Sequence, residues 1–200
     1  MLASLVGVTR ILLARHGETD WNRDGRWQGH ADTSLNATGR EQAHELERFL
    51  ADVELDAVYS SDLRRALETA EIVARAKGLT VVSDSALREI DDLEWTGLTW
   101  SEIESRFPEG ARRHRAGGTG WEPGETWEAM SERVIVALTR IATTHPGGCV
   151  LCVVHGGPIR VVLAHAIGLD LGEYRRTQAE PANGGVSEIA VEDGTFRRID

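Results

Sequence analysis

The sequence has few of the features that mark disulfide scaffolds, membrane spans or nucleic-acid-binding surfaces. It contains two cysteines among 200 residues, and no apolar run approaches the roughly 20 residues that cross a bilayer. The formal net charge is −10, which argues against a general nucleic-acid-binding surface. The opening MLASLVG has no basic segment and is too short for a signal peptide. These absences predict a globular protein of the cytoplasm with no membrane or nucleic-acid partner.

Lysine is nearly absent as well. Lys77 is the only lysine among the 22 basic residues, and the others are arginines. A cationic pocket in this protein must therefore be built from guanidinium groups, which bind phosphate or carboxylate oxygens through paired N–H donors.

The two cysteines form a C-x-x-C pattern inside an apolar run at 149–154. This run is typical of a buried strand, in which successive side chains point to opposite faces of the sheet. Cys149 and Cys152 are three residues apart and should face opposite sides, so we expect neither a disulfide nor a shared metal. We expect both to be small core residues.

Strand and helix patterns alternate along the chain, which predicts an α/β fold: a three-layer sandwich with a mostly parallel central sheet flanked by helices. The interpretation places residues 1–200 in one domain, with a variable cap insertion near 98–124. Helical spacing of Ala43, Leu46, Phe49 and Leu50 predicts a helix capped by Asn36 or Thr38. The remaining expected elements are strands at 8–14, 57–59, 81–82 and 149–154, helices at 62–77, 99–106, 125–144 and 156–167, an irregular stretch at 108–124, and a hairpin at 186–199.

Two of the expected strands are each followed directly by histidine and glycine. Arg15-His16-Gly17 ends the first strand, and His155-Gly156-Gly157 ends the strand at 149–154. Ligands of open α/β sheets bind beyond the carboxyl ends of the strands, so the two imidazoles can share one pocket. Arg64 and Arg65 follow a third strand and Glu89 follows a fourth. A site that gathers so much positive charge is sensible only for an anion, and phosphate is the obvious candidate.

Four segments in this order resemble the histidine phosphatase superfamily, in the branch that contains the cofactor-dependent phosphoglycerate mutases and many small phosphatases. They are Arg15-His16-Gly17-Glu18-Thr19, the stretch SSDLRRALETA at 60–70, Leu87-Arg88-Glu89, and Val154-His155-Gly156-Gly157. The likeness runs from about residue 9 to 190. It implies the phosphoglycerate mutase-like fold and metal-independent phosphoryl transfer through a phosphohistidine, with no cofactor.

The resemblance also implies a role for each matching residue. His16 would be the nucleophile, Arg15 and Arg65 would hold the phosphoryl oxygens, and His155 would stabilise the charge of the transition state. Glu89 would give a proton to the leaving oxygen and then accept one from water. The residues expected to complete the phosphate pocket or to contact substrate are Thr19, Asn22, Gln28, Gly29, Gly156 and Gly157. The pocket arginine of the family directly precedes alanine, which selects Arg65 and leaves Arg64 to the surface.

Within this resemblance the chain is interpreted as a small phosphatase that hydrolyses a phosphomonoester of a small metabolite. True mutases of the family are longer, whereas this sequence stops at Asp200 soon after the hairpin, and the segment at 123–126 matches the small-phosphatase pattern. A phosphoglycerate mutase is the alternative. A non-catalytic phospho-ligand-binding module and a metal-dependent hydrolase built on His16 and His155 are weaker hypotheses from other classes.

Several questions stay open at this level. The run Arg112-Arg113-His114-Arg115 either forms a solvated surface or binds a second anionic group from within the cap. Trp21 and Trp27 either cover the pocket or anchor a long loop, while Trp95 and Trp100 are expected in the core. The natural substrate and the oligomeric state, a homodimer included, are not determined.

Overall fold

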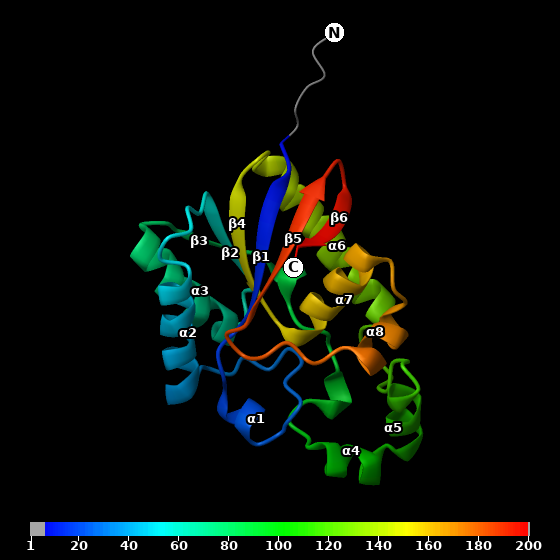
Figure 1. Ribbon diagram of the computed structural model, residues 1–200. Helices are drawn as coiled ribbons and strands as arrows, with labels where there is room; N and C mark the ends of the chain where they lie inside the picture. The colour runs from blue at the N-terminus through cyan, green and yellow to red at the C-terminus, as the bar shows by residue number, and fades with distance from the viewer. Residues whose placement is uncertain (1–6, 200) are drawn as a thin grey trace.

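A six-stranded sheet with the order β3-β2-β4-β1-β5-β6 runs through the middle of the computed structural model, which describes residues 7–199 (Figure 1). β1 (Thr9–Arg15), β2 (Ala57–Ser60), β3 (Val81–Ser83) and β4 (Cys149–Val154) are parallel. β5 (Val186–Glu192) pairs antiparallel with β1, and β6 (Thr195–Ile199) forms a hairpin with β5. The predicted mostly parallel sheet is confirmed.

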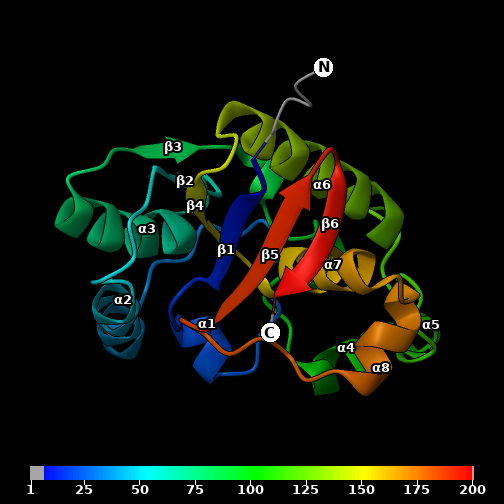
Figure 2. The same cartoon turned by 45° about the horizontal axis from the view of Figure 1, so that its top comes forward.

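Helices cover both faces of this sheet. α2 (Ala37–Phe49) and α3 (Arg64–Lys77) lie on one face, and α6 (Trp127–Thr144) and α7 (Gly156–Ile167) lie on the other (Figure 2). The central strand β4 is buried along its whole length and supplies alternate residues to the two cores. Cys149 packs in the α2–α3 core and Cys152 in the α6–α7 core, both as free thiols. The three-layer prediction and the opposite placement of the cysteines are therefore confirmed.

Local signals explain where α2 begins and which face it buries. The Asn36 side chain accepts a hydrogen bond from the backbone N–H of Gly39, so Asn36 rather than Thr38 caps the helix. Leu46 and Leu50 are buried, whereas Phe49 is 71% exposed. The predicted helix is present, but Phe49 lies outside its buried face, because the buried residues follow the i, i+3, i+7 spacing that begins at Ala43.

The carboxyl ends of the parallel strands are covered by short helices: α1 (Asp20–Arg23), α4 (Trp100–Arg106), α5 (Pro108–Arg115) and α8 (Leu171–Thr177) (Figure 1). The expectation of an irregular stretch from residue 108 is wrong for its first part. Pro108 ends α4, yet it also occupies the first turn of α5, where its missing N–H is not needed. The sequence interpretation also missed α8, whose first turn is capped by the Asp170 side chain.

Whether 98–124 acts as a cap, and whether the chain forms one domain, stay predictions. No helix within residues 7–199 is both long and apolar enough to cross a membrane.

A cluster of tryptophans fixes α4 and α5 to the rest of the protein. Trp27 lies 5.2 Å from Trp95 and Trp95 lies 5.2 Å from Trp121, measured between ring centroids. Trp95 and Trp121 are fully buried, and Trp100 packs half-buried against them. The cluster ties the loop after α1 to the segment at 95–127, so that the distant parts of the chain meet above the ends of the strands.

Close backbone packing holds the turn that follows β1. A Cβ atom added to Gly17 would lie 2.2 Å from the carbonyl oxygen of Gly39, and one added to Gly39 would lie 2.0 Å from that of Glu18. The neighbouring atoms belong to rigid backbone, so they cannot move aside. The two glycines therefore let the start of α2 approach the residue that follows His16.

We expect Gly17→Ala to destabilise the protein by about 2–3 kcal/mol, because the added methyl group must displace the backbone at the start of α2. Chemical denaturation checks this value. Gly118→Ala is the matched control, since a Cβ there meets only one atom at 3.4 Å. Equal stability of the two variants would show that the turn tolerates displacement.

Candidate active site

A cavity of about 660 Å³ lies at the carboxyl ends of the strands. All of the predicted site residues line it except Thr19 and His155. Those that do are Arg15, His16, Asn22, Gln28, Gly29, Arg65, Glu89, Gly156 and Gly157. The carboxyl ends of the strands therefore bring nine of the predicted residues to one cavity. The charges of these side chains decide what the cavity binds.

His16 lies directly after β1 with its imidazole almost fully buried at the cavity. Its Nδ1 lies 2.7 Å from the carbonyl oxygen of Gly17, which can only accept a hydrogen bond. Nδ1 therefore carries the proton, and Nε2 keeps a free lone pair. Burial, together with the charges of Arg65 and Arg15, holds the pKa of His16 well below its ordinary value. The imidazole is consequently neutral at pH 7.

His155 follows β4 and lies next to His16, with their ring centroids 5.1 Å apart. It is completely buried, and neither ring nitrogen has a hydrogen-bond partner among residues 7–199. Burial and then the charge of Arg65 hold the pKa of His155 well below its ordinary value. The site thus contains two neutral imidazoles in contact, which is a costly arrangement unless a ligand uses them.

Two arginines flank this pair. Arg65, in the first turn of α3, is buried, and its Nη atoms donate to the carbonyl oxygens of Ala31 at 2.7 Å and Gly29 at 2.9 Å. Burial lowers the pKa of Arg65 to about 10, so the group remains charged at neutral pH. Arg15 donates to the carbonyl oxygen of Pro181 and lies 3.0 Å from the Glu180 carboxylate.

Arg64 points away from this site. Its backbone N–H donates to Asp32 at 2.7 Å, and its side chain is largely exposed.

Backbone groups hold the Glu89 carboxylate at the cavity wall. Oε1 accepts from the N–H of Ile90 at 2.9 Å, and Oε2 accepts from that of Gly157 at 3.2 Å. A Cβ on Gly157 would lie 2.1 Å from Oε1, so a larger residue there would push the Glu89 carboxylate out of this position. The backbone carbonyl of Glu89 is fixed by Arg133 Nη2 at 2.9 Å and contacts His30 Nε2 at 2.8 Å.

Thr19 contacts residues of the cavity wall and does not line the cavity itself. It is fully buried, and its hydroxyl lies 2.9 Å from Gln28 Oε1 and 3.1 Å from Asn22 Oδ1. Thr19 therefore positions two cavity residues and is not among the lining residues itself. Asn183, which sequence reasoning missed, lines the cavity and donates to the carbonyl oxygen of His16 at 2.9 Å.

The basic run at 112–115 divides between surface and cavity. Arg112 and Arg113 are exposed, with ion pairs to Glu109 and Glu122. Arg115 lines the cavity, pairs with Glu104 and lies over the ring of Trp100. His114 packs 5.0 Å from the Trp27 ring, and burial lowers its pKa to about 3, so it is neutral. Trp27 also lines the cavity, which makes it both a wall and an anchor, whereas Trp21 is absent from the described lining.

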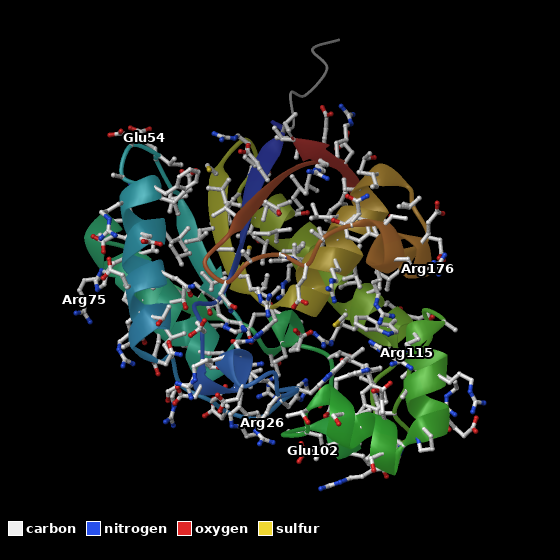
Figure 3. All side chains as sticks on the ribbon, turned by 60° about the horizontal axis from the view of Figure 1, so that its bottom comes forward. Arg26, Glu54, Arg75, Glu102, Arg115 and Arg176 are labelled. Atoms are coloured by element: carbon white, nitrogen blue, oxygen red, sulfur yellow. The ribbon has the colours of Figure 1, made fainter. Side chains whose placement is uncertain are left out.

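Further charged residues line the cavity without having been expected. Arg160 comes from α7, and Arg175 and Arg176 come from α8. Figure 3 shows Arg26, Arg115 and Arg176 on separate elements around this end of the molecule. The adjacent arginines of α8 are visible in the sequence, but their position depends on a helix that was not anticipated.

Asp92 is the second acidic residue of the wall. It follows Glu89 by three residues and, like Glu89, lines the cavity. It is fully buried beside Gly29 and accepts a hydrogen bond from the Thr96 hydroxyl at 2.6 Å. Burial raises the pKa of Asp92 to about 7.

The acidic, cysteine and histidine residues of 7–199 form no group of three or more with the arrangement to hold a metal ion.

Comparison with known proteins assigns this chain to a family. The Histidine phosphatase superfamily (branch 1) matches residues 11–199, and the chain belongs to it. Phosphoglycerate mutase-like protein 4 of Arabidopsis thaliana is 38% identical over 166 residues, covering 80% of this chain and 72% of its own length. Phosphoserine phosphatase 1 of Hydrogenobacter thermophilus is 32% identical over 169 residues, covering 84% and 80%. The solved structure of Bacillus stearothermophilus YhfR superposes with a TM-score of 0.89 at 34% identity, over 95% of both chains.

We expect Asp92→Asn to stabilise the protein more at pH 8 than at pH 5. Burial raises the pKa of Asp92 from its ordinary value of 3.8 to about 7 in the folded protein. The free energy of unfolding therefore falls as the pH rises from about 4 to about 7, because the folded protein binds the Asp92 proton more tightly than the unfolded chain does. Above pH 7 the buried carboxylate is charged, and its full cost to stability is present. The gain in Tm should be roughly 2–6 °C larger at pH 8.

Thermal unfolding at the two pH values measures this difference, with the exposed Asp52→Asn as the control. Equal gains at both pH values would show that Asp92 is ionised throughout the range.

Proposed function

We propose that this protein is a cytoplasmic phosphatase that hydrolyses a small phosphorylated metabolite through a phosphohistidine intermediate on His16. One observation carries the proposal: a neutral imidazole with Nδ1 held by the Gly17 carbonyl lies between two guanidinium groups at a cavity that also contains Glu89. A neutral imidazole is a nucleophile, guanidinium groups bind phosphoryl oxygens, and a carboxyl group can move a proton.

In the first step, the lone pair on His16 Nε2 attacks phosphorus, and the bond between phosphorus and the ester oxygen breaks. Glu89 gives its proton to that oxygen, so that an alcohol leaves and an Nε2–P bond remains. The Nδ1–H of His16 keeps its hydrogen bond to Gly17 and shares the positive charge of the phosphorylated ring. Arg15 and Arg65 bind the phosphoryl oxygens, whose charge is what the protein must stabilise in such a transfer.

In the second step, water attacks phosphorus and the Nε2–P bond breaks. Glu89, now a carboxylate, accepts the proton of the water, and inorganic phosphate leaves. His155 stabilises the transferring group in both steps as a buried, polar neighbour of His16. The Arg133 side chain fixes the backbone around Glu89, so that the carboxyl group returns to the same position in each cycle.

Hydrolysis is the outcome that we favour over transfer back to the substrate. The related phosphoserine phosphatase of H. thermophilus is named for hydrolysis. Arginines that neutralise the phosphoryl charge support transfer without a metal ion. We propose in addition that the predicted cap at 98–124 lies over the leaving group.

We expect His16→Ala to lower turnover of a phosphomonoester by more than about 10³-fold, because the covalent route is removed. The same variant should form no acid-labile phosphoenzyme when mixed with labelled substrate and quenched in alkali. His44→Ala, which removes an exposed imidazole of α2, is the control and should label normally. Labelled phosphoenzyme in the His16 variant would assign the nucleophile elsewhere.

A panel of phosphomonoesters with and without 2,3-bisphosphoglycerate distinguishes a phosphatase from a mutase. We expect phosphate release from at least one substrate at a rate that the bisphosphate does not increase, because water completes the cycle. Phosphate assays and chromatography of the isomerised product measure both outcomes. Isomerisation of 3-phosphoglycerate faster than phosphate release would contradict hydrolysis.

A further inference from the structure

The cavity has more positive charge than a phosphoryl group needs. Seven arginines and three carboxylates line it. Arg15 and Arg65 are beside His16 and account for the phosphoryl oxygens. Arg160 and Arg175 enter the same cavity from α7 and α8, and a second group of cations in one small space is costly unless an anion joins them.

Arg175 is the clearest member of this second group. Its guanidinium lies 4.2 Å from the centre of the Trp127 ring, donates to the carbonyl oxygen of Gly117 at 3.0 Å and lies 2.8 Å from Nε2 of His114. None of these partners carries a negative charge, and His114 is held neutral. No carboxylate among residues 7–199 forms an ion pair with Arg175, although a guanidinium has five N–H donors to share.

The surroundings of Arg175 disfavour its charge in the absence of an anion. Burial and the neighbouring charge of Arg160 lower the pKa of Arg175 to about 10. The stacking on Trp127 and the bonds to Gly117 and His114 nevertheless fix its plane and direction. A held, half-buried guanidinium of this kind is prepared for an anionic oxygen group before that group arrives.

Arg160 connects this second group to the phosphoryl site. One oxygen of the Glu180 carboxylate lies 3.0 Å from Arg15 Nη1, and the other lies 3.2 Å from Arg160 Nη2. The protein's own carboxylate therefore spans the space between an arginine of the phosphoryl site and an arginine of the second group. Glu180 is 55% exposed on its side chain, so a carboxylate of the substrate can take its place on Arg160 with little loss of packing.

From this arrangement we propose that Arg160 and Arg175 bind a carboxylate of the substrate, so that the preferred substrate is a phosphomonoester that also carries a carboxyl group. The proposal rests on the proposed phosphatase function and names the substrate class of that site. Two basic side chains that approach from one side of the cavity match the two oxygens of a carboxylate. The spacing observed around Glu180 shows that a carboxylate fits beside the phosphoryl-binding Arg15.

The test compares pairs of substrates that differ only in the carboxyl group. The first pair is 3-phosphoglycerate and glycerol 3-phosphate, and the second is O-phosphoserine and O-phosphoethanolamine. Values of kcat/KM are measured for wild type, Arg175→Gln, Arg160→Gln and a control. The control is Arg112→Gln, which removes an exposed arginine of the basic run at 112–115 that pairs only with Glu109 in the described structure. Hydrolysis of p-nitrophenyl phosphate, which has no carboxyl group, reports the intact phosphoryl site.

We expect wild type to prefer the carboxylated member of at least one pair, and each of the two variants to reduce that preference roughly 10–100-fold, chiefly through KM. Their activity on p-nitrophenyl phosphate should stay within about 3-fold of wild type, since no charge in the phosphoryl site changes. Arg112→Gln should leave both values unchanged.

Equal kcat/KM for the members of both pairs in wild type would overturn the carboxylate site while leaving the phosphatase function intact. A preference that survives in both variants would overturn it as well. A wild-type protein that releases phosphate from none of the compounds, p-nitrophenyl phosphate included, would instead refute the proposed function. If Arg175→Gln loses all activity because the contact with Gly117 supports folding, the wild-type preference and Arg160→Gln still decide the outcome.

Discussion

A buried imidazole next to two guanidinium groups stays neutral, and most of the site follows from this constraint. His16 can be held close to Arg65 and Arg15 only because it carries no charge at neutral pH. The Gly17 carbonyl then determines which ring nitrogen has the proton, so a single backbone hydrogen bond directs the nucleophilic lone pair. The close contact of Gly17 with Gly39 keeps that carbonyl in place by packing α2 against the turn. The chemistry of the site thus depends on backbone geometry at the end of β1.

The second feature of the site is that rigid elements hold each charged side chain. Arg133 bonds to consecutive carbonyls around Glu89, and backbone N–H groups hold both carboxylate oxygens. Arg65 is fixed by two carbonyl oxygens of the loop that carries Gly29. Groups positioned in this way need little rearrangement when a phosphoryl group binds, which is the main contribution a protein makes to this kind of transfer.

Much of this site could be predicted, because the relevant signals are local. A buried strand that ends in histidine and glycine marks a strand end at which ligands bind, and the parallel sheet brings two such ends together. The alternation of side chains along a strand was enough to separate Cys149 from Cys152. Local reasoning failed where the residue type alone does not determine its place in the structure. Pro108 ends one helix and begins the next, and Phe49 is apolar yet lies outside the buried stripe.

The sequence by itself determined the sheet class, the strand-end residues and the family, because each of these is indicated by a short segment of residues adjacent in the chain. Only the tertiary structure decided which arginines share the cavity. Arg112 and Arg113 lie at the surface, whereas Arg160 and Arg175, from helices after the last parallel strand, face the nucleophile's pocket. The tryptophan cluster likewise brings Trp27 into contact with Trp95 and Trp121, which lie far from it along the chain. The physical reason is that burial and charge pairing act between residues that become neighbours only when the helices pack on the sheet.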